Sequence, residues 1–158
     1  TLADARNRVN QESMRIGQLM AREWVASRYP EAGEPIHGGV GAPSRANDFD
    51  AVYVVPRGEG QRPLILIIEA KGGSGTLGIR EVNRAAVQQG TGNYMLEIAR
   101  LMATDTSLPP ATRSAMRDVR QRNVDVRYVL IEAPIGTDAG RPTLRPGRIS
   151  EFNISLSP

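Results

Sequence analysis

Two stretches of the chain decide its fold: residues 50–55, which read DAVYVV, and residues 64–71, which read LILIIEAK. The first is rich in β-branched and aromatic residues, a composition typical of a β-strand. The unbroken apolar run in the second is typical of a central strand that is covered on both faces. The segment between them, residues 56–63, contains Gly and Pro and predicts a turn. We therefore expect the two strands to form an antiparallel hairpin.

Segments on both sides of this hairpin predict helices and further strands. The expected helices cover residues 4–27, 80–103 and 110–122, and the expected strands cover residues 124–131 and 149–156. Tyr29-Pro30 ends the first helix, and the second is broken at residues 90–92, where Thr91 or Asn93 is a suitable N-cap. This order of elements indicates an α/β fold with a mixed sheet of four or five strands flanked by helices.

Length and composition are those of a single globular domain over residues 1–158. Hydrophobic residues make up 40% of the chain and charged residues 23%, which excludes a disordered chain. No apolar run approaches the roughly 18 residues of a membrane-spanning helix, so we expect no membrane-spanning segment. The first residue is Thr1 and not an initiator Met, so we expect this domain to be the C-terminal fragment of a longer protein.

The rarity of cysteine and histidine narrows the possible chemistry. The chain has no cysteine, which excludes disulfide scaffolds, thiol nucleophiles and zinc sites built on Cys. The single histidine, His37, argues against zinc catalysis and Ser–His–Asp chemistry. A metal would then be held mainly by carboxylates, a ligand set that suits Mg²⁺ or Mn²⁺. The formal net charge of +3 and the dominance of Arg among the cations permit a nucleic-acid partner.

Charged residues stand at one end of the expected hairpin. Asp50 opens the first strand and Glu69 closes the second, so antiparallel pairing would bring the two carboxylates together. Lys71 lies two residues after Glu69 and therefore projects from the same face of the strand. Two close carboxylates repel each other unless a cation lies between them. We expect Asp50, Glu69 and the carbonyl of Ala70 to bind Mg²⁺ or Mn²⁺. Lys71 would then reach the attacking water or a phosphate oxygen, as phosphodiester hydrolysis requires.

The succession of Asp50, a hairpin and Glu69-Ala70-Lys71 resembles the PD-(D/E)xK nuclease superfamily, whose members have the restriction-endonuclease-like fold. The pattern of that family is an Asp, one hairpin, and then Glu-x-Lys at the end of an apolar strand. Here Phe49 occupies the position of the family's Pro, and many members of the family also lack a Pro at this position. The resemblance covers residues 46–75. It implies a restriction-endonuclease-like core and a metal-dependent nuclease activity.

Two flanking segments are similar to the versions of this superfamily found as C-terminal domains of bacterial polymorphic and contact-dependent inhibition toxins. A helical Glu often completes the metal site in such nucleases, which implies that Glu12 is a further metal ligand and catalytic residue, with Glu23 as the alternative. Glu12 is chosen because it shares a helical face with Val9 and Ile16. Residues 89–94, which begin with Gln89, resemble the Gln…Tyr element that follows the core in many relatives. The resemblance implies that Gln89 contacts the site or the substrate.

The same resemblance implies a biological role. It indicates a DNase that acts as an interbacterial toxin, delivered from the producing bacterium into the cytoplasm of a target cell. A cognate immunity protein would be its partner. A tRNA-cleaving toxin of the same fold is the alternative substrate choice. A catalytically inactive nucleic-acid-binding module is the alternative from another class, and a housekeeping nuclease of repair or defence is a third option.

The carboxylates of the expected hairpin also have simpler interpretations. Asp48 is an alternative to Asp50 as the metal ligand, although the sequence favours a role for Asp48 as a solvated or capping residue of the turn. Glu69 could be a strand-end carboxylate that is merely paired with Lys71. In that case the two side chains would form an ordinary surface ion pair, and the hairpin would carry no chemistry.

Three further features have a functional and a structural interpretation. His37 lies in a segment rich in Gly and Pro, where it is either a base or substrate contact or a solvated side chain. One helical face carries Arg113, Arg117 and Arg120, which contact phosphates or are solvated. Residues 72–75 read GGSG and lack the ending of a Walker loop, so they indicate a flexible loop on the substrate side.

Overall fold

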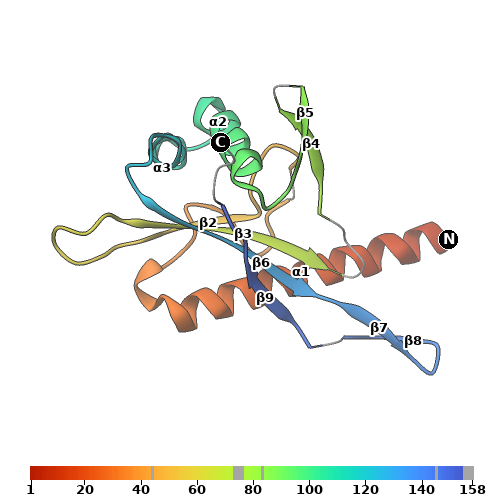
Figure 1. Ribbon diagram of the computed structural model, residues 1–158. Helices are drawn as coiled ribbons and strands as arrows, with labels where there is room; N and C mark the ends of the chain where they lie inside the picture. The colour runs from red at the N-terminus through yellow and green to blue at the C-terminus, as the bar shows by residue number, and fades with distance from the viewer. Residues whose placement is uncertain (44, 73–76, 83, 145, 155–158) are drawn as a thin grey trace.

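The long apolar strand β3 (Leu64–Gly72) lies at the centre of a five-stranded sheet with the order β1-β2-β3-β6-β9 (Figure 1). The computed structural model describes residues 1–43, 45–72, 77–82, 84–144 and 146–154. The other strands of this sheet are β1 (His37–Gly38), β2 (Ala51–Val55), β6 (Asp125–Ala133) and β9 (Arg148–Glu151). The helices are α1 (Leu2–Arg28), the 3-10 helix η1 (Pro30–Ala32), α2 (Gly92–Thr104) and α3 (Pro110–Gln121). Two separate hairpins pair β4 (Ile79–Val82) with β5 (Ala85–Gln88) and β7 (Ile135–Asp138) with β8 (Arg141–Leu144).

The sheet is mixed, as predicted. β2 runs antiparallel to β3, with Ala51 opposite Ile68, and this pairing confirms the expected hairpin. β3 and β6 run parallel, and β9 is antiparallel to β6. A parallel pair needs a long crossover connection, and the segment that contains α2 and α3 provides it.

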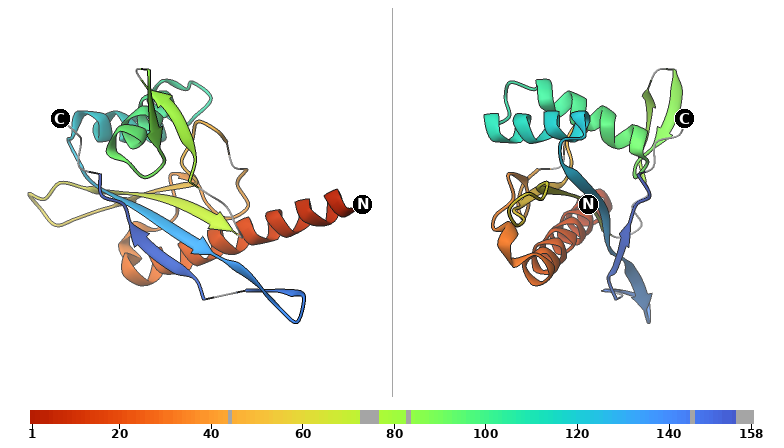
Figure 2. Two further views of the ribbon diagram at one scale, coloured as in Figure 1. Left: turned by 45° about the vertical axis from the view of Figure 1, so that its right-hand side comes forward. Right: turned by 60° about the vertical axis from the view of Figure 1, so that its left-hand side comes forward.

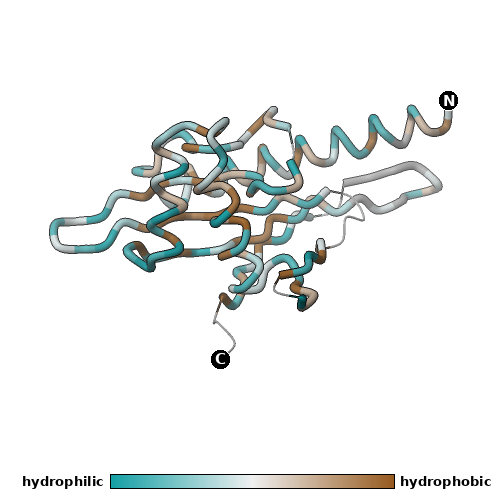
Figure 3. The backbone as a smooth tube through the Cα atoms, turned by 90° about the horizontal axis from the view of Figure 1, so that it is seen from above, coloured by the Kyte–Doolittle hydropathy of each residue, from teal (hydrophilic) through white to brown (hydrophobic). Residues whose placement is uncertain are grey.

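The side chains of β3 alternate between two separate hydrophobic cores. Ile65 and Ile67 pack with buried residues of α2 and α3, whereas Leu66 and Ile68 pack with buried residues of α1. Figure 2 shows α2 and α3 on one side of the sheet and α1 on the other. Residues 64–70 are all buried, as expected for a central strand that is covered on both faces. The chain therefore forms three layers, and the most hydrophobic residues lie in the central strands (Figure 3).

Helix α1 docks on the sheet through its second half. Ser13, Gly17, Ala21 and Val25 are buried and follow one another at intervals of four residues, so they share one helical face. Residues 1–5 and 7–12 are exposed, and this first part of the helix projects beyond the sheet (Figures 1 and 3). The close approach of α1 to β3 requires a glycine at position 72, because a Cβ there would lie 2.1 Å from Ser13 Oγ.

The expected helix over residues 80–103 is wrong in its first half. Residues 79–82 and 85–88 form the paired strands β4 and β5, and α2 starts at Gly92 with Thr91 as its N-cap. The segment is rich in Ala, Arg and Gln, which favour helices, but this preference is weak and tertiary contacts override it. The backbone N–H of Gln89 donates to the carbonyl of Gly78 (2.7 Å), and the Gly78 N–H donates to Gln89 Oε1 (3.1 Å). These two bonds hold the ends of the hairpin together.

The other predicted elements are confirmed with shifted bounds. α1 and α3 match the expected helices over residues 4–27 and 110–122. β6 extends the expected strand over residues 124–131 to Ala133. The final strand was expected over residues 149–156; β9 covers Arg148–Glu151, and residues 155–156 lie outside the described residues. The β7–β8 hairpin has no counterpart among the predicted elements. Within the described part of the chain, no helix has the length and hydropathy to cross a membrane.

Gly38 of β1 packs closely against the backbone at the start of β2. Its φ is +66°, and a Cβ there would lie 2.0 Å from the carbonyl oxygen of Asp50. Gly41 also has a positive φ, +80°, but a Cβ there would meet open space. Both Gly38→Ala and Gly41→Ala should strain the backbone, but only Gly38→Ala also overpacks the β1–β2 contact. We predict that Gly38→Ala lowers the free energy of unfolding by about 1–3 kcal/mol more than Gly41→Ala. Urea denaturation of the two variants measures this difference, and equal losses would contradict it.

Candidate active site

Asp50 lies directly opposite Glu69 at the open end of the β2–β3 hairpin. The pairing of Ala51 with Ile68 sets this register, since Asp50 directly precedes Ala51 and Glu69 directly follows Ile68 on the antiparallel strand. Asp50 Oδ2 accepts a hydrogen bond from the Ala70 N–H at 2.8 Å, which holds the end of β2 against β3. The two carboxylates therefore meet as predicted.

Strand alternation places both carboxylates on the face of the sheet that α2 and α3 cover. Ile65 and Ile67 belong to this face, and Glu69 and Lys71 continue the same alternation. On β2, Val52 belongs to the same face, and Asp50 is two residues before it. The carboxylates and the amine of Lys71 thus share one side of the sheet.

Glu69 is held by two neutral hydrogen-bond partners. Its side chain is buried, with 3% of the residue exposed. The Tyr128 hydroxyl donates to Glu69 Oε1 at 2.8 Å, and the Gln89 side chain forms a second hydrogen bond with the carboxylate. Gln89 is itself buried and accepts from the Gly78 N–H, which leaves its amide NH₂ to face Glu69. The sequence indicated Gln89 for this region, and the structure places it in contact with Glu69.

The environment of Glu69 disfavours its charged form. Burial is the largest cause and the negative charge of Asp50 adds to it, and together they raise the pKa of Glu69 to about 8. The hydrogen bonds from Gln89 and Tyr128 act in the opposite direction and lower this pKa. A buried carboxylate with a strongly raised pKa beside a second carboxylate is typical of a functional site.

Tyr128 is the site residue that the sequence did not single out as functional. It is fully buried, and its ring lies 5.7 Å from that of Phe49 and 4.7 Å from that of Phe152. Burial and the charge of Glu69 raise the pKa of the Tyr128 hydroxyl, so it remains a proton donor. The sequence places Tyr128 on the apolar face of a strand, where its hydroxyl would be buried. A buried tyrosine hydroxyl needs a hydrogen-bond partner, and this requirement was the signal that could have identified Tyr128.

Lys71 is the only lysine of the chain. It is half-buried on β3 and stands beside Glu132 of β6, but the Glu132 carboxylate pairs with Arg148 at 3.6 Å. Among the described residues, no ion pair joins Lys71 to a carboxylate. Glu69 is therefore not the ion-pair partner of Lys71, and the simpler interpretation of this pair has no support in the structure.

Glu12 does not join the two carboxylates. It is exposed on α1, as is the alternative Glu23. α1 covers the face of the sheet to which Ile68 belongs, whereas Glu69 is on the opposite face. In the described residues, no group of three or more His, Asp or Glu side chains lies close enough to hold a metal ion. The expectation of Glu12 as a third carboxylate used the apolar positions Val9 and Ile16, but the buried face of α1 is a different one.

His37 and Asp48 form a separate cluster. His37 lies in β1 and is largely buried, with its Nε2 at 3.3 Å from Asp48 Oδ2, and is not a solvated loop residue. Burial lowers the pKa of His37, while the nearby Asp48 carboxylate raises it. Arg45 also pairs with Asp48, at 3.5 Å. Asp48 thus faces His37 and Arg45, and Asp50 is the carboxylate that faces Glu69.

Comparisons of the chain with protein-family models, with curated proteins and with solved structures found no match. The case for a function therefore depends on the geometry of the site. The loop over residues 72–75, which the sequence indicated for the substrate side, lies outside the described residues from Gly73 onward.

The raised pKa of Glu69 predicts a particular pH dependence of stability. In the unfolded chain Glu69 ionises near its ordinary value of 4.5, whereas the folded protein keeps the proton up to about pH 8. Folding therefore binds a proton between these values, and the contribution of Glu69 to stability decreases as pH rises through this window. Above the folded pKa the loss is complete, on the order of a few kcal/mol.

Glu69→Gln removes this titration and keeps the shape of the side chain. We predict that, in EDTA, the stability of Glu69→Gln relative to the wild type increases from pH 5 to pH 8 (between the two pKa values) and then stays constant. Urea denaturation across this pH range measures the difference. Glu59→Gln, in the exposed β2–β3 turn, is the control and should parallel the wild type. Parallel curves for Glu69→Gln as well would contradict the prediction.

Proposed function

We propose that the protein is a metal-dependent nuclease that hydrolyses phosphodiester bonds in nucleic acids. The observation that carries this proposal is the buried Glu69 carboxylate opposite Asp50, with the only lysine of the chain two residues further along the same strand face. Two carboxylates and one amine at the end of a central strand supply a cation site and a hydrogen-bond donor for a phosphate or a water.

The residues of this site fit a divalent cation. Glu69 is buried beside Asp50, and the donors Gln89 and Tyr128 that bind its carboxylate are neutral, so a bound cation would stabilise the ionised form of the pair. Carboxylate oxygens and a backbone carbonyl are the ligands that Mg²⁺ and Mn²⁺ prefer. Asp50, Glu69 and the carbonyl of Ala70 would hold the ion. When bound, the ion would lower the pKa of a water and stabilise negative charge on the phosphate.

The remaining residues have roles that follow from their positions. Lys71 is half-buried and free of carboxylate partners in the described residues, so its ammonium can donate to the attacking water or to a phosphate oxygen. Gln89 and Tyr128 fix the orientation of the Glu69 carboxylate through their hydrogen bonds. We therefore assign Gln89 as a positioning residue and give no metal-ligand role to Glu12.

The three-layer arrangement and the order of β2, β3, helices and β6 support a restriction-endonuclease-like fold within this proposal. DNA is the first substrate in the proposal and tRNA the second, since the chemistry of the site is the same for both. The resemblance to toxin domains extends the proposal to an interbacterial toxin that acts in the cytoplasm of a target cell and has a cognate immunity protein.

A cleavage assay tests the proposed activity. Purified protein is incubated with plasmid DNA and, separately, with total tRNA, each with Mg²⁺, Mn²⁺ or EDTA. We predict metal-dependent cleavage that Asp50→Asn, Glu69→Gln and Lys71→Met each reduce by about 100-fold or more, because each removes stabilisation of the charged transition state. Glu59→Gln is the matched control for lost carboxylate charge and should cleave like the wild type.

The outcomes of this assay separate the alternatives. Cleavage of tRNA alone would keep the site and change the substrate. Absence of cleavage of either polymer under every metal condition would contradict a nuclease and favour an inactive nucleic-acid-binding module. Expression in the bacterial cytosol gives a second readout, since a toxin domain should arrest growth and Lys71→Met should relieve the arrest. A nuclease that cleaves but does not arrest growth would favour the housekeeping alternative.

A further inference from the structure

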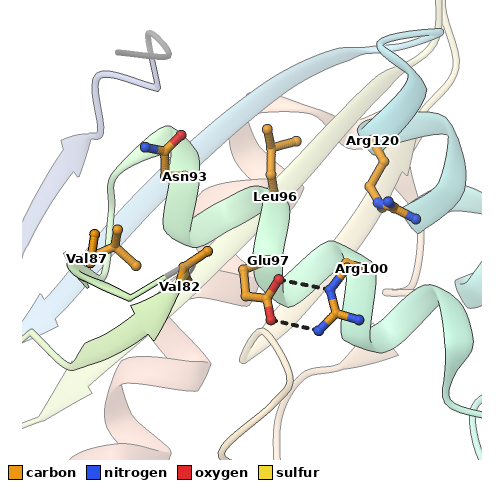
Figure 4. A pocket seen from close by; sticks show the side chains of 8 residues that line it. Val82, Val87, Asn93, Leu96, Glu97, Arg100 and Arg120 are labelled. Atoms are coloured by element: carbon orange, nitrogen blue, oxygen red, sulfur yellow. Dashed lines mark hydrogen bonds and ion pairs between the residues drawn. The ribbon is translucent and has the colours of Figure 1, made fainter. Parts of the chain in front are cut away.

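A groove of about 450 Å³ lies between the β4–β5 hairpin and the helices α2 and α3 (Figure 4). Its volume is in the range of small-ligand sites. Apolar side chains of the hairpin, Val82 and Val87, form one wall together with Leu96 of α2. Figure 4 shows Val82 and Val87 on one side of α2 and Arg120 of α3 on the other. None of this groove takes part in the candidate active site described above.

The opposite wall of the groove is positively charged. Arg100 binds Glu97 through two hydrogen bonds, at 2.8 and 2.7 Å, which neutralise that carboxylate. The pKa of Glu97 is lowered, and the hydrogen bond from Arg100 is the largest cause. The positive charges of Arg100, Arg80 and Arg120 lower this pKa further. Among the residues that line the groove, one carboxylate and two guanidinium groups leave a net positive charge. In the described residues, no ion pair involves Arg120.

The groove begins next to the candidate active site. Gln89, which contacts Glu69, directly follows β5, and the α2 wall starts at Asn93. The next residue, Tyr94, interacts with charges of both signs. Burial is the largest cause of its raised pKa, the negative charges of Glu69 and Asp50 raise this pKa further, and Arg80 lowers it. Tyr94 thus responds to the acidic pair and to Arg80 of β4, the strand that also carries Val82 of the groove wall.

We propose that this groove binds the nucleic-acid strand next to the bond that is cleaved. Arg120 contacts a backbone phosphate, and Arg100 adds the Nη1 donor that its two hydrogen bonds to Glu97 do not use. Sugars or bases pack against the apolar wall of Val82, Val87 and Leu96. Guanidinium groups suit this task because their planar fork binds two phosphate oxygens at once. The inference rests on the proposed function and deepens it by separating a cation site at Asp50 and Glu69 from a phosphate-binding groove.

The arginines of α3 provide a matched comparison. Arg120 lines the groove, whereas Arg117 is exposed on the same helix and does not. Replacing either one removes the same charge from the same element. Because both side chains are exposed, neither substitution removes a buried contact, and the two variants should fold alike.

Binding is measured by fluorescence anisotropy in EDTA over a range of salt concentrations. The probes are a fluorescein-labelled single-stranded DNA oligonucleotide and an RNA of the same sequence. Arg120→Gln should weaken binding by about 3- to 10-fold and should reduce the slope of log K against log salt by about 0.7, the change for one lost phosphate contact on a single strand. Arg117→Gln should leave both quantities near those of the wild type. The probe that is affected more identifies whether the groove serves DNA or RNA.

The possible failures are distinguishable. Equal losses of binding affinity in Arg117→Gln and Arg120→Gln would indicate a general basic surface and would overturn the proposed binding groove. An Arg120→Gln variant that binds like the wild type would also overturn it. If the wild type cleaves nucleic acid in either of these cases, only the inference fails. A wild type that neither binds the probes nor cleaves plasmid or tRNA overturns both the groove and the proposed function.

Discussion

The hydrogen bond from the Ala70 N–H to Asp50 Oδ2 closes the end of the β2–β3 hairpin, and the geometry of the site depends on it. Side chains alternate between the two faces of a strand, so a slip of one residue would exchange the α1 face of β3 with the α2–α3 face. The apolar side chains of both cores resist such a slip, because all of residues 64–70 are buried. The same register that packs the cores therefore places Glu69 opposite Asp50.

Sequence patterns predicted the parts of the fold that local chemistry determines. The hairpin, its buried central strand and the meeting of Asp50 with Glu69 follow from an apolar run, a turn and strand alternation. The β4–β5 hairpin did not follow, because its ends are held by bonds between Gln89 and Gly78 that no local pattern contains. Glu12 was expected at the site because its helical face was inferred from Val9, which the structure leaves exposed. A helix pattern alone does not say which layer the helix joins.

Charge is divided between two neighbouring regions of one face. The acidic pair of Asp50 and Glu69 is held by the neutral donors Gln89 and Tyr128, while the arginines gather along α2 and α3. Tyr94, at the start of α2, responds to the charges of the acidic pair and of Arg80. An arrangement of this kind lets a cation and a polyanion approach the same place without competing for the same side chains. The proposed chemistry and the proposed binding groove are thus two aspects of a single electrostatic pattern.

The parallel pairing of β3 with β6 also has a consequence for how the chain reaches its native state. The two strands lie side by side, although β6 begins about 60 residues after the start of β3. Contacts between distant segments form slowly, since the intervening chain must lose much of its conformational entropy first. Until β6 docks, one edge of the most apolar segment of the protein is open, and open apolar edges promote aggregation. The strand that supplies the centre of the core and the buried Glu69 is therefore also the segment most exposed to aggregation during folding.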